Sequence, residues 1–144
     1  MRFLKHFIFT LLYITSSQMV GQGLEDYKWK NRLLIFVTQN SDNQALKTNL
    51  NAFTEEQQDL SERDLLLFIL NPESINNPNG NDLDLNAEVT YNQLNLTSDF
   101  DGVLLIGKDG GIKAKEAYPV TPETIFTKID GMPMRQAEKR NGER

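Results

Sequence analysis

The chain has 144 residues, a length that suits one domain with one hydrophobic core. It carries 15 lysines and arginines against 20 aspartates and glutamates, a formal net charge of −5. Nucleic-acid-binding proteins use a basic stripe to displace counterions from phosphates, so this acidic balance predicts no nucleic-acid partner.

Residues 1–23 have the pattern of a secretory signal peptide. Arg2 and Lys5 precede a short apolar run from Phe7 to Ile14, and small and polar residues follow. The run is shorter than the about 20 apolar residues that a membrane-spanning helix needs. We therefore expect cleavage within residues 21–23 and a secreted or periplasmic mature protein that is not attached to a membrane. A buried N-terminal helix is the alternative interpretation.

The sequence contains no cysteine, and its single histidine, His6, lies in the segment that cleavage would remove. Disulfide exchange and peroxide reduction need a thiol, and Ser-His-Asp catalysis needs an imidazole. Catalytic zinc sites also draw mainly on histidine and cysteine. The mature chain is therefore expected to lack thiol redox and histidine-dependent catalysis, and we expect no bound cofactor.

Two apolar strands separated by a helix are predicted in the first half. Leu33 to Val37 is a continuous apolar run, typical of a strand buried on both faces of a sheet. Ser41 followed by Gln44 predicts a capping box at the start of a helix over residues 42–59. Asp64 to Leu70 is a second apolar run. This order predicts a parallel βαβ unit with a right-handed crossover.

An asparagine-rich stretch, residues 71–86, follows the second strand. It holds six asparagines, two prolines and a glycine, a composition that predicts an exposed irregular loop. Residues 87–96 contain several apolar side chains and are expected to form a short helix.

A β-hairpin is predicted next. Strands over residues 102–107 and 112–118 flank a turn in which Gly110 and Gly111 supply positive φ angles. Ile112 begins an alternation of apolar and lysine residues in the second strand, which predicts one buried face and one wet face.

Two helices close the chain. Thr121 is expected to cap the first helix, Pro122 to occupy its first position and Gly131 to end it. Pro133 is expected to begin a short second helix, and the last residues, 141–144, to form a disordered tail.

The order of these elements predicts an α/β, thioredoxin-like fold over residues 24–140. Its mixed four-stranded sheet would consist of the βαβ unit and the β-hairpin, with helices on its faces.

Three segments carry a resemblance to a known family: "YKWKNRLLIFV" entering the first strand, "LLIGKDGGIK" at the hairpin and "IDGMPMRQAEKR" near the end. They resemble the family called domain of unknown function 4174, which is thioredoxin-like and largely bacterial and whose members commonly have signal peptides. The likeness covers most of Asp26 to Arg140 but not the asparagine-rich loop. The resemblance implies a fold and brings no established activity.

The loop after the first strand is the first candidate binding site. In thioredoxin-type folds the reactive thiols lie here, at the N-terminus of a helix that stabilises anions. This chain has Thr38, Gln39, Asn40 and Ser41 in that place. Free backbone N–H groups there would hold a carboxylate or phosphate. A plain helix cap made by Ser41 is the alternative.

Arg135, in the segment "MPMR", is the second candidate binding residue. Its guanidinium could bind an acidic partner or pair with Asp130. The alternative is a C-terminal helix that packs on the sheet with its charges in water.

A weaker candidate is a calcium site formed by Asp82, Asp84, Asn86 and Glu88, which place oxygen ligands at every second residue. Against this, Ala87 stands where an EF-hand loop needs glycine, and a solvated acidic loop is the alternative.

These observations predict a non-catalytic binding or interaction module whose partner is a protein or a small anionic ligand. The alternative is a carboxylate- or calcium-dependent enzyme, or a calcium-binding protein.

Overall fold

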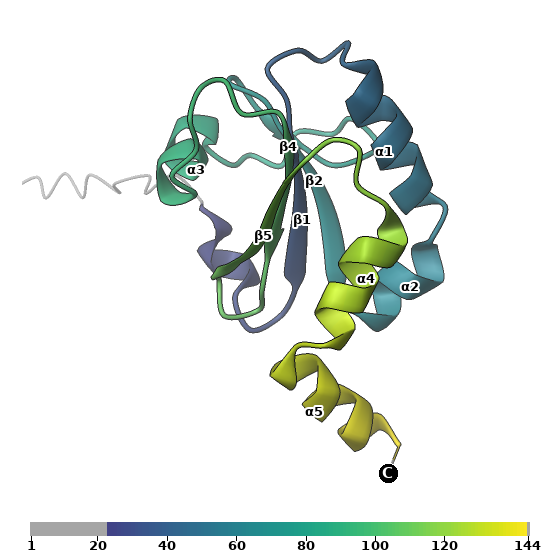
Figure 1. The fold of residues 1–144 in the computed structure, drawn as a ribbon. Helices are drawn as coiled ribbons and strands as arrows, with labels where there is room; N and C mark the ends of the chain where they lie inside the picture. Colours follow the sequence, from purple (N-terminus) through teal and green to yellow (C-terminus); the bar gives the residue numbers. More distant parts are fainter. Residues whose placement is uncertain (1–22, 144) are drawn as a thin grey trace, which may run out of the picture.

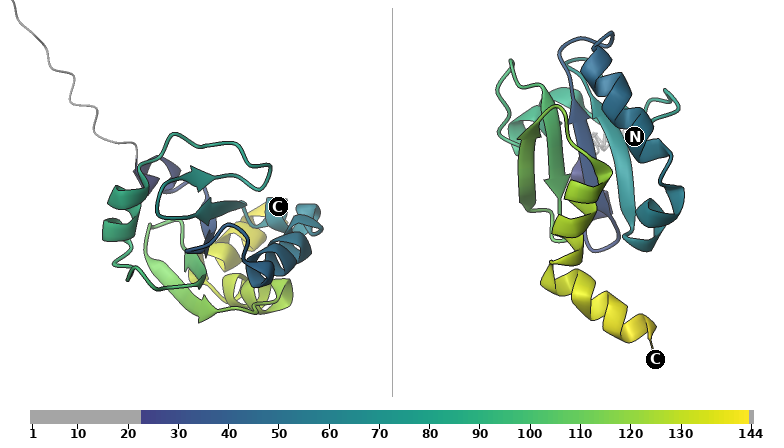
Figure 2. Two further views of the ribbon diagram at one scale, coloured as in Figure 1. Left: turned by 90° about the horizontal axis from the view of Figure 1, so that it is seen from above. Right: turned by 45° about the vertical axis from the view of Figure 1, so that its right-hand side comes forward.

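The computed structural model describes residues 23–143. All but the last residue of the predicted signal peptide lies outside this range. The chain forms a five-stranded mixed sheet with the strand order β3-β2-β1-β4-β5, between two layers of helices (Figures 1 and 2). The strands are β1 (Arg32–Val37), β2 (Leu65–Leu70), β3 (Ile75–Asn76), β4 (Gly102–Ile106) and β5 (Ile112–Ala117). The helices are the 3₁₀ helix η1 (Leu24–Tyr27), α1 (Gln44–Thr54), α2 (Gln57–Glu62), α3 (Ala87–Gln93), α4 (Pro122–Asp130) and α5 (Pro133–Gly142).

The predicted parallel βαβ unit and antiparallel hairpin are both present. β1 is the central strand, and it pairs in parallel with β2 and antiparallel with β4. All six of its residues are buried, including the five of the predicted apolar run, Leu33 to Val37. The predicted short helix is α3, and the predicted Thr121 cap and Pro122 start of α4 are also found.

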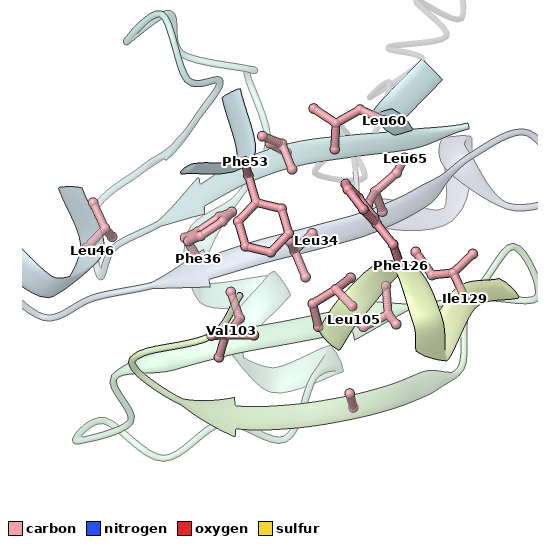
Figure 3. Packing of buried hydrophobic residues seen from close by; sticks show 14 residues of the cluster. Leu34, Phe36, Leu46, Phe53, Leu60, Leu65, Val103, Leu105, Phe126 and Ile129 are labelled. Carbon is pink, nitrogen blue, oxygen red and sulfur yellow. The ribbon is translucent and has the colours of Figure 1, made fainter. Parts of the chain in front are cut away.

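Helices α1, α2 and α4 cover one face of the sheet, and η1 and α3 cover the other. On the first face Phe53 of α1 lies between Phe36 of β1 and Phe126 of α4 (Figure 3). Both ring pairs meet edge to face, with centroids 5.5 Å and 6.1 Å apart. Edge-to-face pairs are favourable beyond the area they bury, so Phe53 holds the two helices to the central strand.

The first long helix differs from the prediction in two ways. Its cap is Asn43, not Ser41, because the Asn43 side chain accepts hydrogen bonds from Ala45 N (2.9 Å) and Leu46 N (3.3 Å). The prediction of one continuous helix over residues 42–59 is also wrong, because this segment forms two helices, α1 and α2. The chain bends at Glu56, whose ψ of 44° is not helical, and α2 begins after it.

The sheet has a fifth strand, which the prediction of an exposed loop over residues 71–86 missed. The Asn71 side chain accepts hydrogen bonds from the backbone of Glu73 and Ser74 and reverses the chain. Ile75, only 1% exposed, then enters the core beside Leu70. Burial of this apolar side chain, rather than a strand-like sequence, holds β3 in place.

The hairpin also differs in detail. Gly110 has the predicted positive φ, 81°, whereas Gly111 does not. Ile112, predicted to be buried, is 47% exposed, because a bulge between Leu105 and Ile106 shifts the register at the start of β5. At the end of the chain α5 begins at Pro133 as predicted and continues to Gly142, so the first half of the expected tail is helical.

Candidate functional site

The loop that follows β1 lies where the sequence placed a binding site, at the carboxyl end of the central strand. Thr38 is 1% exposed, and its hydroxyl donates to the backbone oxygen of Asn40 at 2.7 Å. The same hydroxyl accepts a hydrogen bond from Asn40 N at 3.1 Å. Thr38 therefore shapes the loop from inside and presents no group to a ligand.

Gln39 connects this loop to two distant parts of the chain. Its amide nitrogen Nε2 donates to the Tyr91 hydroxyl of α3 at 3.1 Å and to the Phe100 backbone oxygen at 3.3 Å. Its backbone N–H donates to the Asp101 carboxylate at 3.1 Å. Burial raises the pKa of the Tyr91 hydroxyl and the Asp101 charge raises it further, so this phenol stays neutral.

The N-terminus of α1 already holds a side chain of its own. Asn43 Oδ1 occupies the two backbone N–H groups that a bound anion would use, those of Ala45 and Leu46. The Asn40 side chain accepts from Asp42 N at 2.9 Å, while Ser41 is exposed in the turn between them. Ser41 and Asn40 thus form part of the loop surface, and the anion position is filled.

Two further groups enclose the carboxyl end of β1. The Tyr118 hydroxyl donates to the Val37 backbone oxygen at 3.0 Å, and burial raises the pKa of this phenol strongly. Asn49 of α1, 5% exposed, accepts a hydrogen bond from Val120 N at 2.6 Å. The Tyr118–Pro119 peptide bond between these contacts is cis. These partners of the loop were not singled out from the sequence.

Arg135, the other predicted binding residue, belongs to α5, and this helix lies at the opposite end of the sheet (Figure 1). Arg135 is 8% exposed. Its Nη1 donates to the Glu62 backbone oxygen at 2.6 Å, and its Nε donates to Asp130 at 3.3 Å. The predicted alternative, an ion pair with Asp130, is therefore the contact found. The structure does not bring Arg135 together with Thr38, Gln39, Asn40 and Ser41.

Arg135 and Asp130 belong to a larger ionic cluster whose other members were not singled out from the sequence. The cluster joins the start of β1, the end of α2, the β4–β5 turn, α4 and α5. Its members are Arg32, Arg63, Lys108, Asp130, Arg135 and Glu138. Burial alone would raise the pKa of Glu138, but hydrogen bonds from Arg32 and Lys108 outweigh it and lower that pKa. Burial likewise opposes ionisation of Asp130, and Arg63 and Arg135 lower its pKa overall.

The residues of the weak calcium candidate make local contacts. Asp82 accepts from Asp84 N at 2.8 Å, and Asn86 caps α3 by accepting from Val89 N at 2.9 Å. Glu88 lies in the first turn of that helix. Over residues 23–143 no three His, Cys, Asp or Glu side chains come together as a metal site would require. Within the same range, no helix has the length and apolar content to span a bilayer.

A groove of about 830 Å³ runs along the outer side of β2. One wall comes from the end of α1 and from α2, and the other from η1 and the asparagine-rich loop. The groove is lined by Tyr27, Asn31, Thr54, Gln57, Leu60, Ser61, Asp64, Leu65, Leu66, Leu67, Phe68, Asn77, Pro78, Asn79 and Leu83.

The sheet order and the two helical layers define a thioredoxin-like fold, and a solved structure supports this. The chain is similar to the reduced 2-Cys peroxiredoxin of Plasmodium vivax, with a TM-score of 0.54 and 13% identity over 81% of this chain and 84% of that chain. The chain belongs to the family described as domain of unknown function DUF4174, whose model matches residues 23–138. No curated protein matches the sequence significantly.

Proposed function

We propose that this protein is a non-catalytic interaction module that uses the thioredoxin-like scaffold without a thiol. The observation that carries the proposal is that the chain has no cysteine, while the loop at the helix N-terminus carries amide and hydroxyl side chains instead. The polar side-chain groups of Thr38 and Gln39 form hydrogen bonds with other parts of the protein. A reactive nucleophile must be free to reach its substrate, and these groups are not.

A protein partner fits this site better than the small anionic ligand that the sequence also suggested. An anion at a helix N-terminus needs free backbone N–H groups, and the Asn43 cap already occupies two of them. The exposed part of the loop, around Ser41 and Asp42, is a polar surface. Loops held by a rigid scaffold commonly carry binding residues.

We further propose that the module works outside the cytoplasm, in the periplasm or the medium. The support is the sequence pattern of residues 1–23, whose charged head, short apolar run and small residues are typical of an export signal. Expression of the full chain in its source cell, followed by fractionation and N-terminal sequencing, tests this. A new N-terminus at residues 21–24 in the exported fraction is expected, and an intact Met1 on the mature protein would contradict export.

Activity assays test the non-catalytic role. Purified residues 23–144 should reduce insulin disulfides and consume hydrogen peroxide only at the rate of the buffer blank, with dithiothreitol as reductant in both assays. An active thioredoxin run in parallel provides the positive control. Turnover above the blank would overturn the proposal. A calcium titration tests the alternative hypothesis that the protein binds calcium. The melting temperature should not change as calcium is added, whereas a marked rise would favour calcium binding.

A further inference from the structure

β3 covers only one end of the outer side of β2. It pairs antiparallel with β2 at two positions, Ile69 and Leu70. The rest of β2, Leu65–Phe68, pairs with β1 on one side and has no strand on the other among residues 23–143. This stretch, here called the open edge, is the floor of the 830 Å³ groove. The volume of the groove lies within the range of about 300–1,000 Å³ that is common for ligand-binding clefts.

The backbone of the open edge directs hydrogen-bonding groups into the groove at every second residue. On the β1 side, Thr38 N donates to Leu70 O at 3.0 Å. In a parallel pair the peptide groups of alternate residues point to the same side, so the even-numbered residues of β2 face β1 and the odd-numbered residues face away from it. Leu65 and Leu67 thus direct two N–H and two C=O groups into the groove, and these groups have no hydrogen-bond partner within residues 23–143.

These four backbone groups are enclosed as well as unpaired. Leu65 and Leu67 are 4% and 7% exposed, because their side chains pack in the core cluster that includes Leu60 of α2. An enclosed N–H or C=O group without a partner is unfavourable. Donors and acceptors that alternate along a strand at two-residue spacing are matched by another extended backbone. The floor of the groove therefore favours a segment of peptide chain as its ligand.

β3 shows how such a segment pairs with β2, and why β3 itself does not extend over the open edge. Continued in register, β3 would place Pro78 opposite Leu67, where the pairing residue must donate its N–H. Proline has no N–H, so the chain leaves the edge after Asn76 and turns at Gly80, whose φ is 84°. The open edge therefore continues a line along which an antiparallel strand is already paired.

We infer that the open edge binds an extended, apolar segment of another protein by antiparallel strand pairing, in line with β3. Three residues of that segment lie opposite Leu67, Leu66 and Leu65. The first and the third exchange two hydrogen bonds each with the residues that they face. The bound chain leaves the edge before Ile69, because Asn76 of β3 lies opposite that residue.

The groove walls determine which side chains fit. Side chains alternate between the two faces of a sheet, so the middle residue of the bound segment lies on the face of Leu66. Tyr27 of η1 and Leu83 form the wall on that face. The first and third residues lie on the other face, beside Leu60 of α2. An aromatic residue between two β-branched residues, as in Val-Phe-Val, suits both walls and an extended backbone.

The groove provides no partner for a charged side chain. Among the lining residues only Asp64 carries a charge, and its carboxylate is paired with the Lys108 ammonium at 2.7 Å. A charge that enters an enclosed site without a counter-ion loses hydration and gains nothing in return. The bound segment is therefore uncharged at the three paired positions.

The size of the contact sets the expected affinity. Three paired residues bury less than the about 800 Å² per partner of a standard interface, which is typical of transient complexes. We therefore expect a dissociation constant between about ten and a few hundred micromolar. This surface goes beyond the proposed function, because it is separate from the loop at Ser41 and does not depend on the role of that loop.

Fluorescence anisotropy with labelled peptides tests the inference. The probe is the peptide acetyl-Ser-Gly-Val-Phe-Val-Gly-Ser with a fluorophore at its C-terminus. N-methylation of both valines removes the N–H groups that donate to Leu67 O and Leu65 O, and should weaken binding at least about tenfold. N-methylation of the phenylalanine is the matched control, because that N–H points away from β2, and should change binding less than about twofold. Equal binding of the three peptides, or no binding of the parent peptide at about 1 mM protein, would overturn the inference.

A protein variant locates the site. Leu66 is 37% exposed, so Leu66→Lys removes little core packing, and its ammonium lies beside the middle residue of the peptide. The substitution should weaken binding at least about tenfold. Ile112→Lys, at an exposed apolar residue of the opposite edge strand β5, should leave binding unchanged. Equal effects of the two substitutions would contradict binding at the open edge. A wild-type dimer in sedimentation velocity that Leu66→Lys dissociates would identify a second copy as the occupant, and would also overturn the inference.

Hydrogen exchange tests the pairing residue by residue. The amides of Leu65 and Leu67 should exchange faster than those of Leu66 and Phe68 in the free protein, because only the latter two donate to β1. Saturation with the parent peptide should slow exchange at Leu65 and Leu67. Peptide binding without this change would place the peptide elsewhere and refute strand pairing. Thiol assays that stay at the blank while the peptide fails to bind would refute the groove site alone.

Discussion

Arg32, the first residue of β1, and Glu138 of α5 form a two-pronged ion pair across 106 positions of sequence. Nη1 and Nη2 of Arg32 each lie 3.2 Å from one oxygen of the Glu138 carboxylate. Arg32 is 1% exposed, and Nη1 also donates to the backbone oxygen of Arg63 at 2.9 Å. Burying a guanidinium is costly unless it is paired, so α5 is held to the sheet by the residue that neutralises Arg32.

Glu138→Gln should therefore destabilise the protein. The substitution keeps the size of the side chain but leaves the buried Arg32 and the Lys108 ammonium without their shared carboxylate. We expect the free energy of unfolding to fall by about 2–4 kcal/mol, as measured by urea denaturation. Glu73→Gln, in an exposed turn, is the control and should change stability by less than about 0.5 kcal/mol. Equal effects would show that the ion pair contributes nothing beyond its surface charge.

The ionic cluster should also make stability depend on pH. The pKa values of Glu138 and Asp130 are lowered in the fold, so these carboxylates bind protons less readily in the folded state than in the unfolded state. Their contribution is present above the unfolded pKa values, about 4.3 and 3.9, and is lost as pH falls through the lower folded values. Urea denaturation between pH 7 and pH 3 should show stability falling below about pH 5. The slope should be smaller in Glu138→Gln, and an unchanged slope would contradict this assignment.

The main elements of the fold were predictable because their signals are local. The apolar run of β1, the glycine turn before β5 and the Thr121–Pro122 start of α4 each fall within a few residues. β3 was not predictable in this way. It has only two residues inside a polar stretch, and what holds it is the burial of Ile75 against the other elements of the core.

The place of the candidate loop in the fold was predictable from the sequence, but its contacts were not. Gln39 was singled out from its place after β1, whereas its partners Tyr91 and Asp101 lie 52 and 62 residues away. Arg135 was interpreted as a residue that binds an acidic partner or pairs with Asp130, and the pairing with Asp130 is found, whereas the contact with the Glu62 backbone oxygen was not predicted. Contacts between residues that are distant in sequence leave no periodic pattern in the sequence. They can therefore be identified only from the arrangement of the helices and strands in the structure.

Asn43, and not Ser41, caps α1, so alanine substitutions at these two positions should differ in their effect on stability. Asn43→Ala removes the oxygen that accepts from Ala45 N and Leu46 N, and should cost about 1 kcal/mol of stability. Ser41→Ala removes an exposed hydroxyl outside the helix and should change stability by less than about 0.5 kcal/mol. Thermal and urea denaturation of both variants measure this. The reverse order of effects would restore Ser41 as the cap.

Asn49 is the buried polar link between α1 and the segment that leads into α4. Its Oδ1 accepts from Val120 N at 2.6 Å, and its Nδ2 donates to the Ala45 backbone oxygen at 2.9 Å. Asn49→Ala leaves the Val120 N–H buried without that acceptor, and should lower the free energy of unfolding by about 1–3 kcal/mol. Hydrogen exchange at the Val120 amide should also become faster. Asn51→Ala, on the exposed side of the same helix, gains the same helix propensity without losing a buried contact, so it should be neutral or slightly stabilising. If the two variants unfold at the same urea concentration, the Asn49 contact does not hold α1 to this segment.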